Sequence, residues 1–292
     1  MFYDFQTTTY GKWILAGEHA VIRGHAALVF PVKDKKLTLS YHRSTSELNA
    51  HYEGESGADT HLLFWSVLEQ GMHLVGKSLN TLNGHFQLYS NIPVGVGMGA
   101  SAALCVAVAR WFSAQQLLAD WDIYHFAKEL ENLFHGKSSG LDIAGVSAEN
   151  GIFFQEGQYH PIKQVWQPQW YLSSCGQIGI TSHCIQQVQT LWEEAPEQAS
   201  QLDVQMMQSV LRAADALEQP AALELLAQAI NQASDCFKAW GLISESLQKH
   251  MQTLRNAGAV AVKPTGSGGG GYTLSLWASP PPADFKDAMI KV

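Results

Sequence analysis

Three glycines at alternate positions lead directly into an almost wholly apolar segment, NIPVGVGMGASAALCVAVARWF, which spans residues 91–112. Glycine at this density weakens a strand and fills no core, but it lets the backbone turn sharply and approach a ligand closely. Apolar residues from Ser101 to Leu118 lie on all sides of a helix, which predicts a buried helix. Because its amide end carries partial positive charge, the start of this helix is predicted to bind an anion such as a polyphosphate.

The composition limits the classes of protein that this chain can belong to. Its 292 residues are enough for one large domain or two smaller ones, and its net charge of −8 argues against a general nucleic-acid-binding protein. The first residues, MFYDFQTTTYGKW, show no signal-peptide pattern, and no apolar run is long enough to span a membrane. The four cysteines are far apart, which favours buried thiols in the cytoplasm over a metal site at Cys184 beside His183.

The hydrophobic pattern predicts an α+β fold with a domain boundary near Val165, which gives domains 1–165 and 166–292. The first domain is expected to contain two short strands within residues 12–32, further strands over 36–43, 84–93, 151–154 and 159–162, and helices over 61–76 and 123–135. Asp120 or Asp122 is placed to cap the second of these helices. The second domain is mostly helical from residue 181 to 258, and two strands then flank a glycine loop.

Two further glycine patterns resemble nucleotide-binding motifs. Residues 71–78, GMHLVGKS, fit the Walker pattern literally, but a helical segment precedes them and bulky residues fill the loop, so Lys77 is expected in solvent at a helix end. Residues 266–271, GSGGGG, fit GxGxxG but lead into a strand instead of a helix, which argues against a dinucleotide site. This second stretch is either a flexible hairpin tip or a backbone wall against a substrate or phosphate.

Five separated segments resemble motifs of the GHMP kinases. PVGVGMGASAA (93–103) resembles their ATP-phosphate motif, GKWILAGEHAVIRGHAAL (11–28) their amino-terminal motif, and KPTGSGGGG (263–271) their carboxy-terminal motif. ELENLFHGKSSGLD (129–142) is similar to a segment of the mevalonate kinases in particular, and GITSHCIQQV (179–188) to a helix start in their second domain. The motifs run in the expected order, so the resemblance covers the whole chain.

The resemblance implies a two-domain GHMP kinase fold, with a ribosomal-protein-like α/β domain that contains a left-handed βαβ unit and a ferredoxin-like second domain. It implies ATP and Mg²⁺ as cofactors and a small alcohol as substrate, with no nucleic-acid or membrane partner; a homodimer is compatible with it. The expected reaction is phosphorylation of the 5-hydroxyl of mevalonate to 5-phosphomevalonate, in isoprenoid synthesis. The alternatives are phosphomevalonate kinase, another GHMP kinase such as a sugar kinase, or a ligand sensor without turnover.

The same resemblance implies the residues that bind the nucleotide and the metal. The ATP-binding residues are Pro93, Gly95, Gly97, Met98, Gly99, Ala100, Ser101 and Ala102, where Ala100 replaces a serine usual in the family. Ser101 and Glu131 match the magnesium ligands. The helical repeat places Glu129 and Glu131 on opposite flanks of the apolar face and does not choose between them; the choice of Glu131 rests on its spacing from His135 in the family pattern.

The implied catalytic residues are Asp142 and Lys12. Asp142 would act as a general base toward the substrate hydroxyl or orient it, and Lys12 would lower the pKa of the hydroxyl or hold Asp142 ionised. From the residues alone, Asp142 could equally cap the next helix.

Substrate binding is assigned to Glu18, His19, Thr181, Gly266, Ser267 and Gly268, together with Lys12 and Asp142. Outside the resemblance, His19 fits a hydrogen-bonded structural histidine and Thr181 fits a helix cap.

Overall fold

The chain forms two compact units whose sequences are interleaved. The computed structural model describes residues 3–136, 138–286 and 288–292. Unit 1 comprises the residues up to Lys12 together with Pro31–Val94 and Met98–Glu149, and unit 2 comprises Trp13–Phe30, Gly95–Gly97 and Asn150–Val292. Helices and strands occur in both units, and the strands form two sheets, so the expected mixed α+β class is confirmed. The domain division at residue 165 stays a prediction.

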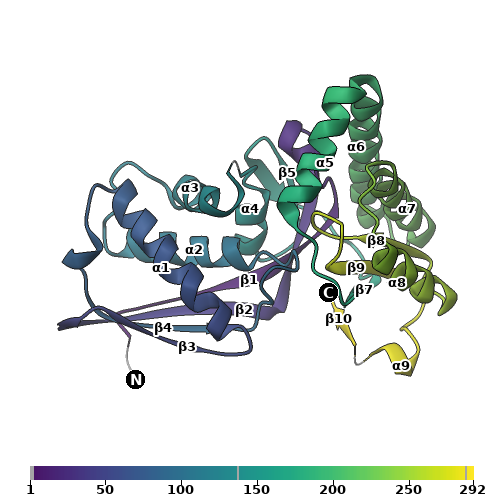
Figure 1. The fold of residues 1–292 in the computed structure, drawn as a ribbon. Coiled ribbons are helices and arrows are strands. Elements are labelled where there is room, and N and C mark those ends of the chain that lie inside the picture. The colour runs from purple at the N-terminus through teal and green to yellow at the C-terminus, as the bar shows by residue number, and fades with distance from the viewer. Residues whose placement is uncertain (1–2, 137, 287) are drawn as a thin grey trace. The chain divides into compact units, whose positions relative to one another are not determined.

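Unit 1 contains a sheet with helices on one of its faces (Figure 1). Its strands come from β1 (Phe5–Ala16), β2 (Ala27–Glu47), β3 (Asn49–Glu53) and β4 (Asn83–Ser90), with β3 parallel and β2 antiparallel to β4. The helices are α1 (Gly57–Leu74), α2 (Ala100–Ala114), α3 (Ile123–His135) and α4 (Leu141–Ser147), and a 3₁₀ turn, η2 (Leu79–Thr81), precedes β4. β1 and β2 are long enough to contribute residues to both units.

One continuous strand, β2, replaces the separate strands expected before and after residue 33. Its pattern is interrupted by the charged run Lys33–Lys36, which lies at exposed and half-buried positions of the strand. Tyr41 and Phe86 face each other across β2 and β4, with ring centroids 4.8 Å apart. Cross-strand aromatic pairs of this kind stabilise a sheet and fix its register.

Helix α2 is buried along almost its whole length, as its all-round apolar sequence predicts. Residues 102–109 are all buried, and Trp111 packs against Phe86 at 5.1 Å between ring centroids. Asp122 caps α3 by accepting a hydrogen bond from the His125 amide at 2.9 Å. The Walker-like residues 71–78 begin inside α1 and continue into an exposed turn that carries Lys77, so they form no phosphate loop.

Unit 2 contains a four-stranded antiparallel sheet and most of the helices of the second half. The sheet has the order β10 (Met289–Lys291), β7 (Gln169–Ser174), β9 (Tyr272–Trp277), β8 (Ala261–Pro264). Residues 27–29 of β2 pair with β5 (Ile152–Gln155), which pairs with β6 (Gln158–Pro161). The helices are η1 (Ala20–Arg23), α5 (Thr181–Glu194), α6 (Pro196–Glu218), α7 (Leu223–Ala239), α8 (Glu245–Asn256) and α9 (Ala283–Lys286).

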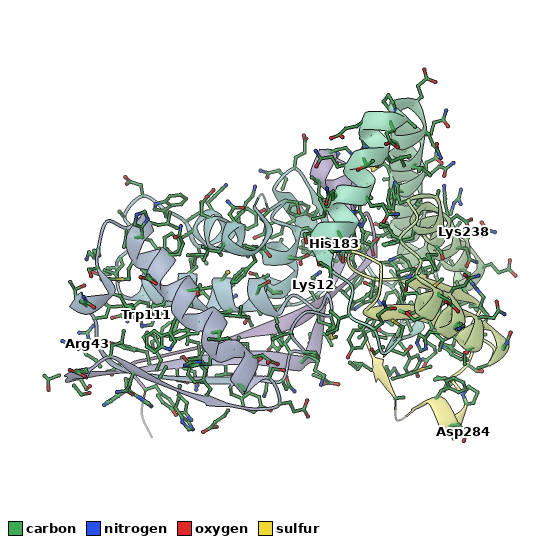
Figure 2. The ribbon with its side chains drawn as sticks, viewed as in Figure 1. Lys12, Arg43, Trp111, His183, Lys238 and Asp284 are labelled. Atoms are coloured by element: carbon green, nitrogen blue, oxygen red, sulfur yellow. The ribbon has the colours of Figure 1, made fainter. Side chains whose placement is uncertain are left out.

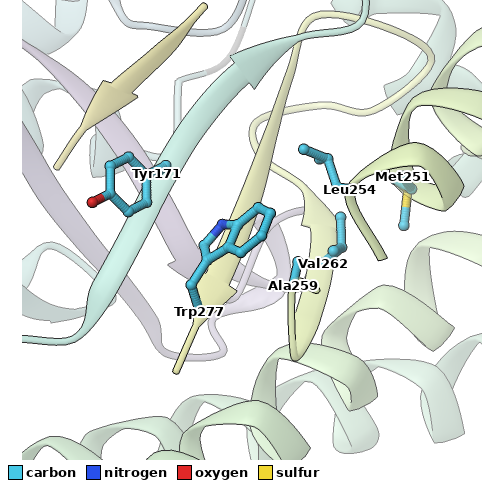
Figure 3. Close-up of a cluster of buried hydrophobic side chains, with 6 residues drawn as sticks. All are labelled: Tyr171, Met251, Leu254, Ala259, Val262 and Trp277. Carbon is cyan, nitrogen blue, oxygen red and sulfur yellow. The ribbon is translucent and has the colours of Figure 1, made fainter. Parts of the chain in front are cut away.

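A buried cluster in unit 2 joins α8 to the sheet (Figure 3). It consists of Tyr171, Met251, Leu254, Ala259, Val262 and Trp277. Burial of a side chain such as Leu254 stabilises the fold by roughly 1.5–3 kcal/mol. The cluster therefore packs α8 against the sheet of unit 2.

Three of the four cysteines are buried, as expected. Cys105, Cys184 and Cys236 are buried free thiols and Cys175 is half-buried. Over the described ranges, each helix is too short or too polar to cross a lipid bilayer.

Candidate functional site

The glycine stretch before α2 ends in a turn that only glycine adopts easily. Gly99 is the N-cap of α2 with φ of 75°, and no side chain caps the helix there. A Cβ atom at Gly99 would lie 2.9 Å from Cγ of Lys12, while the Lys12 amide donates to the Met98 carbonyl at 2.9 Å. The amides of the first turn of α2, with half-buried Ser101 among them, are thus held beside Lys12 and suit an anion.

Lys12 and Asp142 form an ion pair in unit 1. The Lys12 Nζ atom lies 2.9 Å from Oδ1 of Asp142, and the side chains are 3% and 31% exposed (Lys12 is labelled in Figure 2). Asp142 lies in the first turn of α4, but the N-cap is Gly140, so the alternative that Asp142 caps this helix is wrong. Burying a lysine is costly unless a partner compensates for its lost hydration, and here that partner is a carboxylate at partly open surface.

Glu131 lies buried in the same unit, on α3. Ser138 donates a hydrogen bond from Oγ to Oε2 of Glu131, whereas Oε1 has no hydrogen-bond partner among the described residues. Burial, and secondarily the negative charge of Asp142, raises the pKa of Glu131 to about 8. Glu129 is exposed and accepts from Asn132, so burial distinguishes the two glutamates that the helical repeat did not.

Ser138 is a site residue that sequence reasoning did not assign. Its Oγ also accepts a hydrogen bond from the Gly140 amide at 3.0 Å, so it links Glu131 to the turn before α4. The sequence offers no signal for this role beyond the serine itself.

A second polar cluster lies in unit 2 around Glu18. The Glu18 carboxylate pairs with Nζ of Lys263, and both side chains are almost fully buried. Lys263 Nζ also donates to the Ile14 carbonyl at 3.3 Å, and the Thr265 hydroxyl bonds both the amide and the carbonyl of Ile14 at 3.0 Å. Lys263 was not assigned a role from the sequence, because a lysine within an apolar strand gives no sign of its partner.

His19 is a hydrogen-bonded, uncharged histidine. Its Nε2 lies 2.8 Å from the carbonyl oxygen of Ser267, which can only accept, so Nε2 carries the proton. Burial lowers the pKa of His19 to about 4. His19 is therefore a hydrogen-bonded structural histidine, and its partner Ser267 belongs to the glycine stretch 266–271.

The glycine stretch 266–271 is packed backbone to backbone against its neighbours. A Cβ atom at Gly270 would lie 2.7 Å from the Gln177 carbonyl oxygen, and the Gly271 amide donates to that oxygen at 2.6 Å. A Cβ at Gly271 would also lie 3.0 Å from the carbonyl oxygen of Val96, so the middle of the first glycine stretch contacts the second. These contacts favour the backbone wall over a flexible hairpin tip.

Thr181 joins this cluster through its hydroxyl, which lies 3.2 Å from the Ser267 hydroxyl. It is the first residue of α5, whose N-cap is Ile180, and its side chain makes no cap hydrogen bond. The helix-cap alternative for Thr181 is therefore wrong.

The structure thus groups the predicted residues in two sets. Unit 1 brings Lys12, Asp142, Glu131 and Gly99 together, with Met98, Ala100, Ser101 and Ala102 at the start of α2 and Pro93 in the loop before it. Unit 2 brings together Glu18, His19, Thr181, Ser267 and the glycines 95, 97, 266 and 268.

Several known proteins are similar to this chain. The model of the GHMP kinases N terminal domain matches residues 63–149. The chain is 29% identical to the mevalonate kinase of Thermococcus gammatolerans, over 91% of this chain and 86% of that protein. It is also 29% identical to the mevalonate kinase of Archaeoglobus fulgidus, over 93% and 92%. The crystal structure of L. major mevalonate kinase with R-mevalonate has the same fold, with a TM-score of 0.77 at 24% identity over 97% of this chain and 89% of that one.

The chain is thus similar to the GHMP kinases, a family of ATP-dependent small-molecule kinases, within residues 63–149 and to mevalonate kinases over nearly its whole length. The family match covers α2, α3 and α4 and therefore includes Ser101, Glu131 and Asp142.

Proposed function

We propose that this kinase transfers the γ-phosphoryl group of ATP to the 5-hydroxyl of mevalonate and yields ADP and 5-phosphomevalonate. The observation that carries the proposal is the Lys12–Asp142 ion pair beside the amide end of α2. The near full-length relatives reported above support mevalonate as the acceptor, because both are mevalonate kinases.

Residues 93–102 are assigned to the phosphates of ATP. The α2 amides and the small side chains Ala100, Ser101 and Ala102 leave room for a triphosphate at the positive end of the helix dipole. Phosphoryl transfer is mostly positioning and charge stabilisation, so such a cradle supplies much of what the reaction needs.

Ser101 and Glu131 are proposed to hold Mg²⁺. The donor set fits this hard cation, which prefers oxygen ligands, and the buried Oε1 of Glu131 is a carboxylate oxygen that lacks a partner among the described residues. When bound, the ion would neutralise charge on the phosphates.

Asp142 and Lys12 are assigned to the acceptor hydroxyl. The hydroxyl oxygen forms the new bond to the γ-phosphorus, the bond from that phosphorus to the β–γ bridging oxygen breaks, and the hydroxyl proton passes to the Asp142 carboxylate. Lys12 holds this carboxylate in place at a distance of 2.9 Å.

The unit 2 cluster is assigned to the alcohol substrate. Glu18, His19, Thr181, Gly266, Ser267 and Gly268 supply fixed polar groups and close backbone approach, and His19 does so as a neutral imidazole. The proposal also includes the finer family features: a left-handed βαβ unit, for which β3, α1 and the parallel β4 are the candidates, a ferredoxin-like domain after residue 165, a cytoplasmic location and a homodimer.

An ADP-release assay with mevalonate, phosphomevalonate and galactose as separate acceptors tests this function. We expect ADP release with mevalonate and none with the other two acceptors. Preferred turnover with phosphomevalonate or galactose would reassign the acceptor, and ATP binding without turnover on any of them would support the ligand-sensor alternative.

A further inference from the structure

Lys263 is a buried lysine to which the proposed reaction gives no task. Its side chain is fully buried, its Nζ pairs with the Glu18 carboxylate and donates to the Ile14 carbonyl, and it lies 5.2 Å from the centroid of the Phe237 ring. Removing an ammonium group from water is costly unless a carboxylate and hydrogen bonds compensate for it. The same volume filled by an apolar side chain would avoid that cost, so the charge calls for an explanation.

These contacts join three segments of the chain, and the last of them, β8, leads into the glycine stretch 266–271. Ile14 belongs to β1, Glu18 to the turn that follows it, and Lys263 to β8. Thr265, two residues after Lys263, adds two hydrogen bonds to Ile14. The residues just before the glycine stretch are therefore held against Ile14 of β1.

His19 follows Glu18 directly, and its backbone conformation requires that the neighbouring residues be held in place. Its backbone has φ of 59° and ψ of −48°, a conformation that costs energy in a non-glycine residue and persists only where the surroundings enforce it. The ring is held by the Ser267 carbonyl, and the chain is held one residue earlier by the Glu18–Lys263 pair. Phe237 contacts both Lys263 and His19, because its ring centroid lies 5.2 Å from Lys263 Nζ and 6.0 Å from the centroid of the His19 ring.

We propose that Lys263 is a positioning residue for the alcohol substrate. Through Glu18 it holds His19 and the start of the glycine stretch in the geometry that receives the acceptor, and this role rests on the proposed function. An ion pair suits the task better than an apolar contact because its hydrogen bonds fix direction as well as distance.

Lys263→Met, which removes the charge and keeps most of the length of the side chain, tests the role. Misplacement of His19 is expected to raise the KM for mevalonate on the order of a hundredfold, with a smaller change in the KM for ATP. Lys263→Arg, which keeps the charge, is expected to restore most of the loss. Lys238→Met, at an exposed position on α7 (Figure 2), is the matched control and should behave as wild type.

Leu254→Ala separates positioning from stability, because it weakens the cluster of Figure 3 in the same unit without touching Glu18 or His19. It is expected to lower the midpoint of thermal unfolding and to leave both KM values unchanged. If Lys263→Met lowers stability as Leu254→Ala does and also leaves both KM values unchanged, the residue is merely structural and the proposal is overturned.

The ¹⁵N NMR signature of the His19 ring gives a readout that needs no turnover. The wild-type ring should be the neutral Nε2–H tautomer, assigned by loss of its signals in His19→Gln, and Lys263→Met should give a tautomer mixture. Glu18→Gln should do the same, which keeps the test available if Lys263→Met does not fold. An unchanged signature in these variants overturns the proposal, whereas a changed signature in a protein that does not phosphorylate mevalonate overturns only the proposed function.

Discussion

The Lys12 Nζ atom lies 2.9 Å from Asp142 Oδ1, and the Cγ atom of the same lysine would lie 2.9 Å from a Cβ atom at Gly99. One side chain thus contacts the start of α2 with its stem and the α4 carboxylate with its charged end. The amide end of α2 and the Asp142 carboxylate are therefore both held in place by Lys12 in unit 1. A change that displaces the Lys12 side chain is therefore expected to affect both phosphate binding and proton acceptance.

Asp142→Asn is expected to lower kcat by about 10²–10⁴, because the amide cannot accept the hydroxyl proton. Binding of a non-hydrolysable ATP analogue, measured by calorimetry, should persist, since the α2 amides are intact. Asp59→Asn, at an exposed position on α1 in the same unit, should leave kcat unchanged. An Asp142→Asn enzyme with wild-type kcat would remove this carboxylate from catalysis.

Gly99→Ala is expected to reduce both stability and activity, because the new methyl group meets a positive φ and the stem of Lys12. Gly76→Ala is the control, since Gly76 has φ of 68° but no atom of the described residues lies within 4 Å of its Cβ position. Urea unfolding should show a loss of about 1 kcal/mol for Gly76→Ala, from the backbone alone, and roughly 2–4 kcal/mol for Gly99→Ala. Equal losses in the two variants would show that the contact with Lys12 is unimportant.

Glu131→Gln is expected to raise the Mg²⁺ concentration for half-maximal activity about tenfold or more, by loss of a charged ligand. Titration of kcat with MgCl₂ at saturating ATP measures this. Glu129→Gln, two residues earlier at an exposed position, should keep the wild-type titration. The assignment of Glu131 to the metal fails if both variants show the same Mg²⁺ dependence.

The features of the fold that could be predicted are those that depend on residues close together in the sequence. The all-round apolar sequence of α2, the Asp122 cap and the glycine turn at Gly99 depend on neighbours in the chain, so they are visible without tertiary structure. Lys12 and Asp142 were found through motifs, and the structure joins them. Strands β3, β7 and β10 were not predicted, because their short sequences gain stability only from partners distant in the chain.

The remaining site residues depend on burial, which the sequence does not specify. Glu129 and Glu131 are equivalent by helical repeat, and only packing shows that one is exposed and the other buried. Lys263 lies 245 residues from its partner Glu18, a separation at which no local pattern indicates a contact. Ser138 shows its role only when the turn before α4 brings it to Glu131.

His19→Gln is expected to change how stability depends on pH. Burial keeps the folded-state pKa of His19 near 4, below the value of about 6.5 for an exposed histidine, so the unfolded chain binds a proton that the folded protein excludes. The stability contributed by neutral His19 is therefore complete above pH 6.5 and decreases as the pH falls toward 4, by about 2 kcal/mol at pH 5. Urea unfolding of both proteins at pH 7, 6 and 5 should show the advantage of wild type over His19→Gln shrinking by this amount. Comparison of the two proteins cancels the contributions of all other groups, and His183→Gln, at an exposed position on α5, should track wild type at each pH (Figure 2). A constant difference between wild type and His19→Gln across this range would mean that the imidazole is not held neutral in the fold.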